Sequence, residues 1–204
     1  MVCEILGGEA ESRYEEWEEY LIKNMNLIEE RTKDIPESER PVVYWGNTWG
    51  TNFLSSVRLG AHQYEIELCG GILVAPTEGG EFPEINKEQL LSWNPDIIII
   101  DNHGGVPDLV MENAYIEKNW EAVTAVQNEA LYKIPSGVFF LDKGTSSALT
   151  LLWMAKMIHP VLFEDIDLIT ELKYYYETFY DYKLSDEEAE KVLSGWIDTE
   201  NMIR

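Results

Sequence analysis

Cysteine is scarce in this chain of 204 residues. Its two cysteines, Cys3 and Cys69, allow one bridge at most, so they cannot form the disulfide framework of a small secreted domain. No Cys-x-x-Cys pair is present for zinc binding or redox exchange, and the His-Glu-x-x-His, EF-hand and Walker phosphate-loop motifs are missing as well. The sequence therefore carries none of these familiar metal or nucleotide signatures.

Basic residues are also few, since 15 Lys and Arg face 38 Asp and Glu, which gives a net charge of −23. A surface this negative repels phosphate backbones and anionic lipid at long range. The composition therefore disfavours nucleic acid and membrane surfaces as partners.

No apolar run reaches the length of a transmembrane helix. The first twenty residues have neither the basic start nor the long apolar stretch of a signal peptide. These two absences leave two interpretations: a cytoplasmic protein, or a chain whose natural N-terminus is missing.

Hydrophobic residues make up 45% of the chain, with 7 Trp and 11 Tyr among them. A domain of this length buries about 70% of the surface that its unfolded chain exposes, so it needs no disulfide or metal to be stable. We therefore expect a folded domain rather than a disordered tail.

Residues 9–33 place apolar side chains at spacings of three and four and charges between them, which predicts a long amphipathic helix. A polar connector with two prolines follows. Beyond it the pattern predicts strands alternating with helices. Strands are expected at 41–45, 72–75, 96–101, 131–134 and 138–141, and helices at 62–71, at 86–93 and from 146 onward.

This alternation predicts an α/β fold, a three-layer α/β/α lobe with a mostly parallel central sheet. A long N-terminal amphipathic helix precedes the lobe and a helical C-terminal tail ends it. We expect residues 1–40 to form the leading helix and connector, and residues 41–204 to form the lobe. Residues 96–101 are apolar on both faces, as in a central strand covered on both sides.

In such sheets ligands bind beyond the carboxyl ends of the strands, so three loops that follow strands matter most: 46–52, 102–105 and 142–147. The first brings Trp45 and Trp49 near one crevice, with Tyr44 on the opposite side of the strand. Exposed aromatic rings can stack on a flat ligand or close over a cation. The alternative is that these rings pack against a neighbouring helix.

The second loop holds His103, which follows a buried strand and lies close to Asp101. Such a His can bind a metal while the carboxylate orients its other ring nitrogen, or it can hydrogen-bond to backbone in a tight turn. His62 is a further candidate for the same rim. His159 precedes Pro160 at a helix end, where capping is the expected role.

The third loop contains Lys143 and leads into a helix whose first N–H groups suit an anion, although Thr145 or Ser146 can equally serve as an ordinary cap. No Gly-x-Ser-x-Gly motif is present, and no Ser, His and Asp stand in a readable catalytic order. We therefore expect no enzyme activity and no cofactor.

Several stretches resemble the periplasmic metal-chelate binding proteins, which are the solute-binding components of ABC importers. The similar segments are ELCGGILVA (67–75), INKEQLLSWNPDIIIID (85–101), AVTAVQNEALYKIPSG (122–137), SSALTLLWMAKMIHPVLFEDIDL (146–168) and KYYYETFYDYKLSDEEAEKVL (173–193). The resemblance extends over about residues 5–195, in order. It is specific for the family and says little about the ligand.

Members of this family have two α/β lobes joined by a long helix, with the ligand between them. The resemblance covers only the second lobe and the helices that lead into it. It implies a C-terminal lobe whose N-terminal lobe and signal peptide are missing here, from an extracytoplasmic protein of the periplasm or a lipid-anchored one of the cell surface.

For this lobe the resemblance implies ligand contacts by Trp45, Trp49, His103 and Lys143. It also implies that Glu88 docks onto arginines of the transmembrane permease. The implied ligand is an iron complex or another metal chelate, such as a siderophore, haem or corrinoid, and an oxyanion such as molybdate stays open. Two other interpretations are a metal-dependent enzyme on a chelatase-like α/β fold, using His103 and Asp101, and an acidic interaction domain.

Overall fold

The computed structural model of the chain describes residues 7–46, 62–78, 83–100, 121–136 and 147–195. Helices and strands alternate through most of this part, and helices alone follow, as the sequence predicts. The elements are α2 (Glu9–Thr32), a short 3-10 helix η1 (Glu37–Glu39), β1 (Val42–Gly46), α3 (Gln63–Leu68), β2 (Ile72–Val74), α4 (Lys87–Trp93), β3 (Ile97–Ile100), α6 (Thr124–Gln127), β4 (Leu131–Lys133), α7 (Ser147–Ile158), α8 (Leu168–Tyr180) and α9 (Asp186–Leu193).

The strands β1 to β4 form one parallel sheet in the order β2-β1-β3-β4 within the described part of the chain. Gly46 pairs with Ile100, and Ile100 pairs with Lys133, so three strands end side by side. The chain passes from β1 to β2 on one side and from β3 to β4 on the other. The strand order therefore reverses between β1 and β3, and this is the place where open α/β sheets bind ligands.

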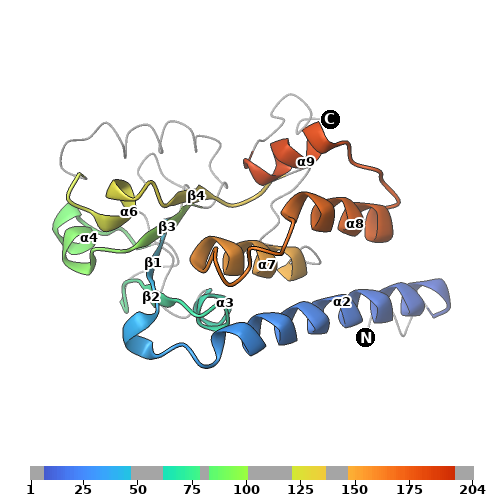
Figure 1. Ribbon diagram of the computed structural model, residues 1–204, viewed down its shortest axis with the longest axis horizontal. Helices are drawn as coiled ribbons and strands as arrows, with labels where there is room; N and C mark the ends of the chain where they lie inside the picture. The colour runs from blue at the N-terminus through green and yellow to red at the C-terminus, as the bar shows by residue number, and fades with distance from the viewer. Residues whose placement is uncertain (1–6, 47–61, 79–82, 101–120, 137–146, 196–204) are drawn as a thin grey trace.

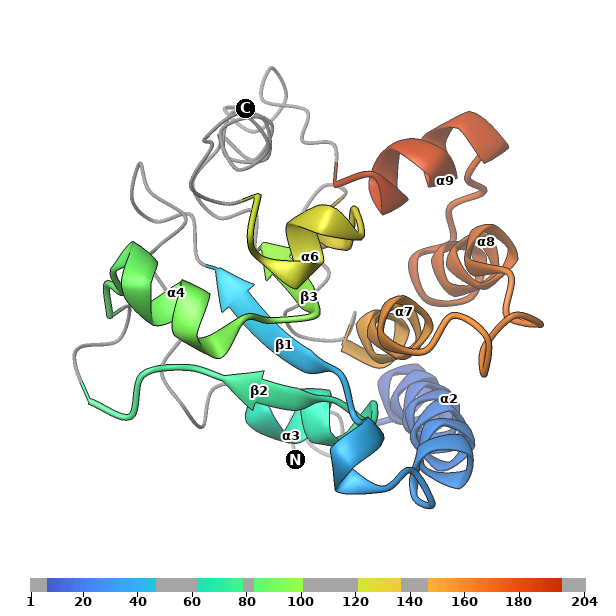
Figure 2. The same cartoon turned by 60° about the vertical axis from the view of Figure 1, so that its left-hand side comes forward.

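Helices cover both faces of the sheet, which confirms the predicted three layers (Figure 2). Strand alternation directs Val43 and Trp45 to one face and Tyr44 to the other. The first face packs against α2, α3 and α7, and the second against α4 and α6. All four residues of β3 are buried, as expected for a central strand.

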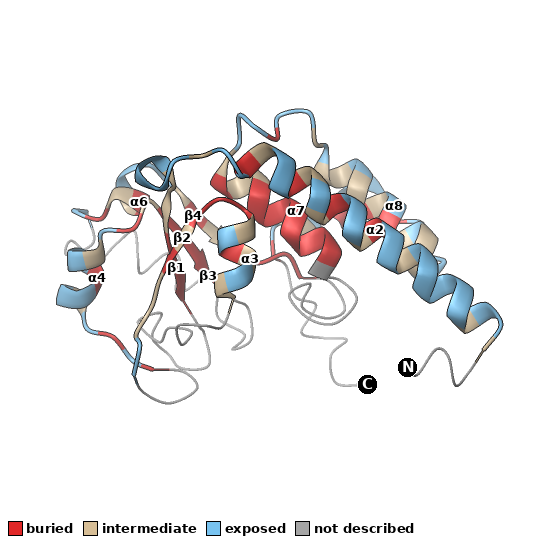
Figure 3. Cartoon of the chain, turned by 90° about the horizontal axis from the view of Figure 1, so that it is seen from below, coloured by how far each residue is buried: buried red, intermediate tan, exposed pale blue. Residues whose placement is uncertain are grey.

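The long helix α2 matches the predicted helix at 9–33 within one residue. It buries Tyr20, Asn24, Ile28 and Thr32, which are spaced four apart and so form one stripe. This stripe packs along α7, the most completely buried helix, while the opposite face of α2 is exposed (Figure 3).

The helices α7, α8 and α9 lie beside the sheet and above α2 (Figure 1). These three helices and α2 form a further apolar cluster, separate from the clusters on the sheet. Tyr20 of α2 lies in this cluster with Leu172 and Tyr175 of α8. The predicted capping box at Ser185 and Glu188 begins α9. The strand expected at 138–141 lies outside the described residues.

The turn at 94–96 connects α4 to β3 at the amino ends of the strands. Asn94 adopts a left-handed conformation, and its side chain accepts from the N–H of Thr124 and donates to the Thr124 hydroxyl, both at 2.9 Å. The backbone N–H of Asp96 donates a hydrogen bond to the carbonyl oxygen of Val42, and the Asp96 carboxylate accepts one from the N–H of Val42, both at 2.8 Å. These polar residues hold α6 and β1 in place, so their role is structural.

Candidate functional site

The carboxyl edge of the sheet brings together the starting points of two predicted ligand loops. Residues 47–61 follow Gly46 of β1, and residues 101–120 follow Ile100 of β3. Because Gly46 and Ile100 are paired neighbours, the two strand ends from which these segments continue lie side by side at the switch point. Trp49 and His103 belong to these loops but lie outside the described residues, as do Asp101 and Lys143.

Trp45 lies at this edge, yet its side chain is fully buried instead of exposed on a rim. It shares the inward face of β1 with Val43 and packs in the apolar core. Its ring stacks on that of His62, with centroids 4.1 Å apart and planes 2° from parallel. The structure thus shows Trp45 packed against its neighbours, which is one of the two possibilities that the sequence left open. A ligand contact by Trp45 stays a prediction.

His62 stands at the beginning of α3, in a left-handed conformation with φ of 55°. Because α3 leads back from the carboxyl edge towards β2, His62 lies at the same edge as the end of β1. The Trp45–His62 stack therefore lies at the carboxyl edge of the sheet, where β1 ends.

His159 lies just beyond the end of α7, as expected, but its ring makes a specific contact with another element. Its Nε2 lies 3.1 Å from the carbonyl oxygen of Gly70 in the α3–β2 turn, so Nε2 carries the proton that is donated. Burial lowers the pKa of His159, and the nearby charge of Arg40 lowers it further. These effects favour the neutral ring, and the capping role expected from the sequence stays a prediction.

Cys69 is a free thiol in the core, and its Sγ donates to the carbonyl oxygen of Leu151 at 3.5 Å. Burial raises the pKa of this thiol, which keeps it protonated and unreactive. Cys3, its only conceivable partner in the chain, lies outside the described residues.

Glu88 is exposed in the first turn of α4, where its carboxylate favours the helix dipole. The predicted cap is present, because the Asn86 side chain accepts from the N–H of Gln89 at 2.7 Å. Since α4 leads into the amino end of β3, its own start lies towards the carboxyl edge. Glu88 is thus an exposed acid near the candidate ligand edge.

A hollow of about 450 Å³ lies beside the start of α4, between residues 75–78 after β2 and residues 84–93. Pro76 and Trp93 line it, together with the exposed acids Glu78 and Glu84. The sequence does not predict this hollow, because the two segments that line it come together only when the sheet places β2 and α4 side by side.

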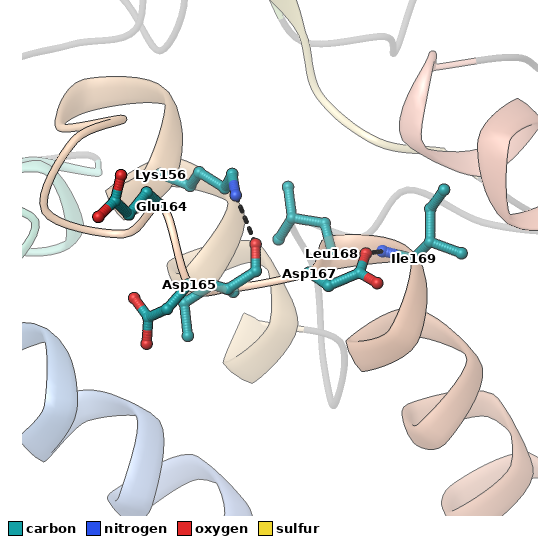
Figure 4. A pocket seen from close by; sticks show the side chains of 7 residues that line it. Lys156, Glu164, Asp165, Asp167, Leu168 and Ile169 are labelled. Atoms are coloured by element: carbon teal, nitrogen blue, oxygen red, sulfur yellow. Dashed lines mark hydrogen bonds between the residues drawn. The ribbon is translucent and has the colours of Figure 1, made fainter.

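A second hollow, of about 370 Å³, lies at the α7–α8 connection (Figure 4). Its polar groups already bond to one another: the Lys156 ammonium donates to the carbonyl oxygen of Ile166, and Asp167 accepts from the N–H of Ile169 at 3.1 Å. Hydrogen bonds, chiefly from Thr170, lower the pKa of Asp167. These contacts fix the turn and cap α8, so this hollow is a structural feature.

Within the described ranges, no group of three or more His, Cys, Asp or Glu side chains is arranged to hold a metal ion. The enzyme interpretation relied on His103 and Asp101, which these ranges do not include. Among the described helices, none combines the length and the apolar character that a membrane crossing requires.

Comparison with known proteins identifies the family. Residues 2–138 match the family model described as periplasmic binding protein. The chain belongs to this family. A curated relative, the molybdate-binding protein MolA of Haemophilus influenzae, is 25% identical over 163 residues, which make up 77% of this chain and 44% of MolA.

Solved structures show the same fold. An ABC transporter solute binding protein from Sulfurospirillum deleyianum matches with a TM-score of 0.78 and 24% identity over 90% of this chain and 57% of its own. A periplasmic solute binding protein from Veillonella parvula matches with a TM-score of 0.72 and 28% identity over 90% of this chain and 54% of its own. The chain thus spans about half the length of the relatives that it matches.

Proposed function

We propose that this chain is the C-terminal lobe of the solute-binding component of an ABC importer. The observation with the greatest weight is the family match over residues 2–138, together with a parallel sheet whose strand order reverses between β1 and β3. In this proposal residues 41–204 form the lobe and residues 1–40 lead into it. A second lobe closes over the carboxyl edge, which agrees with relatives about twice as long.

The proposed ligand is a metal chelate, such as an iron–siderophore complex, haem or a corrinoid. Trp45, Trp49, His103 and Lys143 are proposed to contact it, Trp45 from the end of β1 and the other three from the segments that follow the strands. The aromatic content of the chain supports a large flat ligand. The net charge of −23 argues mildly against an anion.

Molybdate is the second candidate, because the molybdate-binding protein MolA of Haemophilus influenzae is a curated relative of this chain. A structure of MolA bound to molybdate also shares the fold, with a TM-score of 0.71. A Helicobacter pylori relative of the same fold carries Ni(II). Ligand chemistry therefore varies within this fold, which is why both candidates are retained.

The proposed partner is the transmembrane permease of the importer, reached outside the cytoplasm through Glu88. Its exposure on the first turn of α4, near the ligand edge, supports this role. The protein then binds and delivers its solute without catalysis. Membership in a family of binding proteins supports a role in binding rather than in catalysis.

The test is docking of the longer protein that contains this lobe onto its permease in lipid nanodiscs, measured as stimulated ATP hydrolysis. Glu88→Lys reverses the charge at the proposed contact, so stimulation is expected to fall at least tenfold. Glu15→Lys, an equal change on the exposed face of α2, serves as the control. Stimulation that survives Glu88→Lys would show that the docking assignment is wrong.

A further inference from the structure

The described aromatic rings around the end of β1 are divided between the core and the surface. Trp45 is fully buried, and the half-buried ring of His62 is stacked on it with centroids 4.1 Å apart. Tyr64, two residues further along, is 62% exposed, more than any other aromatic side chain in the described part of the chain. Among these three rings, the surface that a ligand can contact therefore belongs to α3 and not to β1.

The direction of α3 brings the Tyr64 ring towards the carboxyl edge of the sheet. The helix begins at this edge, and Tyr64 is its second residue. In an α-helix every Cα–Cβ bond tilts towards the helix start, and the backbone rises only about 1.5 Å per residue. A tyrosine side chain is several times longer than this rise. The Tyr64 ring can therefore reach the level at which β1 ends.

His62 fixes the point from which Tyr64 extends. Its φ of 55° is a left-handed conformation, which is costly for a residue with a Cβ. The stack on Trp45, with planes 2° from parallel, supports this conformation from the buried side. Because the start of α3 is anchored to β1 in this way, a ligand that contacts Tyr64 has little more than the ring itself to order.

We propose that the exposed ring of Tyr64 stacks on the flat conjugated ring of the solute, and that it thereby selects a planar metal chelate of the tetrapyrrole class. This inference rests on the proposed function and narrows its ligand class. Aromatic rings favour offset stacking on another π system, which a tetrapyrrole offers and a tetrahedral oxyanion lacks. Stacking requires no charge on the solute, so it is compatible with the net charge of −23.

An exposed tyrosine on α8 provides the internal comparison. Tyr174 is 49% exposed, and its ring lies 5.8 Å from that of Tyr20 on α2. The helix α7 separates α8 from the sheet (Figure 2). A porphyrin that merely adheres to exposed rings will contact Tyr174 as well as Tyr64, whereas a solute bound at the carboxyl edge will contact Tyr64 alone.

The test is an NMR titration of the 204-residue chain, labelled with 15N and with 13C in its tyrosine rings, with gallium(III) protoporphyrin IX. Gallium makes this analogue of haemin diamagnetic, and the ring current of the macrocycle moves protons above its plane upfield. The ring protons of Tyr64 are expected to move upfield with saturation, together with a shift of the Gly46 amide. The ring protons of Tyr174 should stay in place.

Two substitutions separate the ring of Tyr64 from its hydroxyl group. Tyr64→Ala removes the ring and should weaken porphyrin binding about tenfold, an effect typical of one aromatic stack. Tyr64→Phe keeps the ring and should bind within about twofold of the original chain. Tyr174→Ala, the loss of a similarly exposed ring, should bind like the original chain. The amide spectrum of each variant shows that it is folded.

Porphyrin binding that survives Tyr64→Ala, equal upfield shifts at Tyr64 and Tyr174, or equal weakening by Tyr64→Phe and Tyr64→Ala would overturn the stacking role. If the porphyrin shifts the amides of Gly46 and Ile100 but not the Tyr64 ring, the proposed function stands and this inference fails. If sodium molybdate alone binds at this edge, the proposed function stands with its second ligand, and this inference fails as well. If neither compound binds there, both fail.

Discussion

Arg31 on α2 forms a bidentate ion pair with Asp165 in the α7–α8 connection. Nη1 of Arg31 lies 2.6 Å from Oδ1, and Nη2 lies 2.9 Å from Oδ2. The same guanidinium donates to the carbonyl oxygen of Leu162 at 2.8 Å and lies 5.1 Å from the ring centre of Phe163. One side chain thereby connects the leading helix to the C-terminal helices.

Removing Arg31 should destabilise the protein more than removing an ordinary surface charge. Arg31→Ala loses the ion pair with Asp165, the hydrogen bond to the Leu162 carbonyl oxygen and the contact with the Phe163 ring. Of the three variants compared here, it should therefore lower the melting temperature the most. Arg31→Lys keeps the charge but cannot reproduce the paired geometry, so an intermediate value is expected. Arg13→Ala, whose partner Asp181 is also exposed, is the control with a smaller effect. Equal melting temperatures for Arg31→Ala and Arg13→Ala would contradict this interpretation.

Asn94 should stabilise the folded protein in two ways, through its left-handed backbone conformation and through the hydrogen bonds of its side chain. Asn94→Ala loses the bonds to Thr124 and puts at φ of 44° a residue that tolerates the left-handed region less readily than asparagine, for a total of about 2 kcal/mol in the free energy of unfolding. Asn94→Gly loses the bonds but adopts this conformation readily, so about 1 kcal/mol is expected. Urea denaturation measures both. If the glycine variant is as unstable as the alanine variant, the left-handed conformation contributes nothing.

Gly70 allows a close approach that no other residue permits. It has φ of +78°, and a Cβ added there would lie 2.8 Å from His159 Nε2 and 3.1 Å from Thr32 Cβ. Gly70→Ala should therefore cost about 2–4 kcal/mol in the free energy of unfolding, from backbone strain and overpacking together. Gly7 has a φ of +63° and open space around its Cβ position, so Gly7→Ala reports the backbone term without a steric clash. A similar loss in both variants would exclude the steric explanation.

The contact between His159 and Gly70 predicts a pH effect. The pKa of His159 is lower in the folded protein than in the unfolded chain, where it is about 6.5. The unfolded chain therefore binds the proton more readily, and stability should fall as the pH drops below about 6.5. His159→Gln can still donate to the Gly70 carbonyl but does not titrate. Its melting temperature should change less between pH 7.5 and pH 5 than that of the original chain, and parallel changes would refute this role.

The sequence predicted the elements well where local signals agree. The spacing of apolar residues located α2, the apolar run located β3, and the caps at Asn86 and Ser185 begin helices as expected. These features depend on neighbours within one turn or one strand.

Long-range contacts were beyond such reasoning. For Trp45 the sequence left two possibilities open, exposure at a rim or packing, and the structure shows the side chain buried in the core with the His62 ring stacked on it. The partners of Arg31 and His159 lie 134 and 89 residues away, so no local pattern reveals them. The hollow beside α4 likewise exists only because β2 and α4 are brought together by the sheet.

The solute proposed for this lobe contains a metal and binds at the carboxyl edge of the sheet. The most direct measurement is NMR titration of the 15N-labelled chain with sodium molybdate, haemin, cyanocobalamin and a ferric catecholate siderophore, each taken separately. One of the chelates is predicted to shift the amides of Gly46, His62 and Ile100 with saturation, while Gly70 and Asn94 at the opposite edge stay unchanged. Saturable shifts confined to the amino edge, or none with any of the four compounds, would contradict the claim.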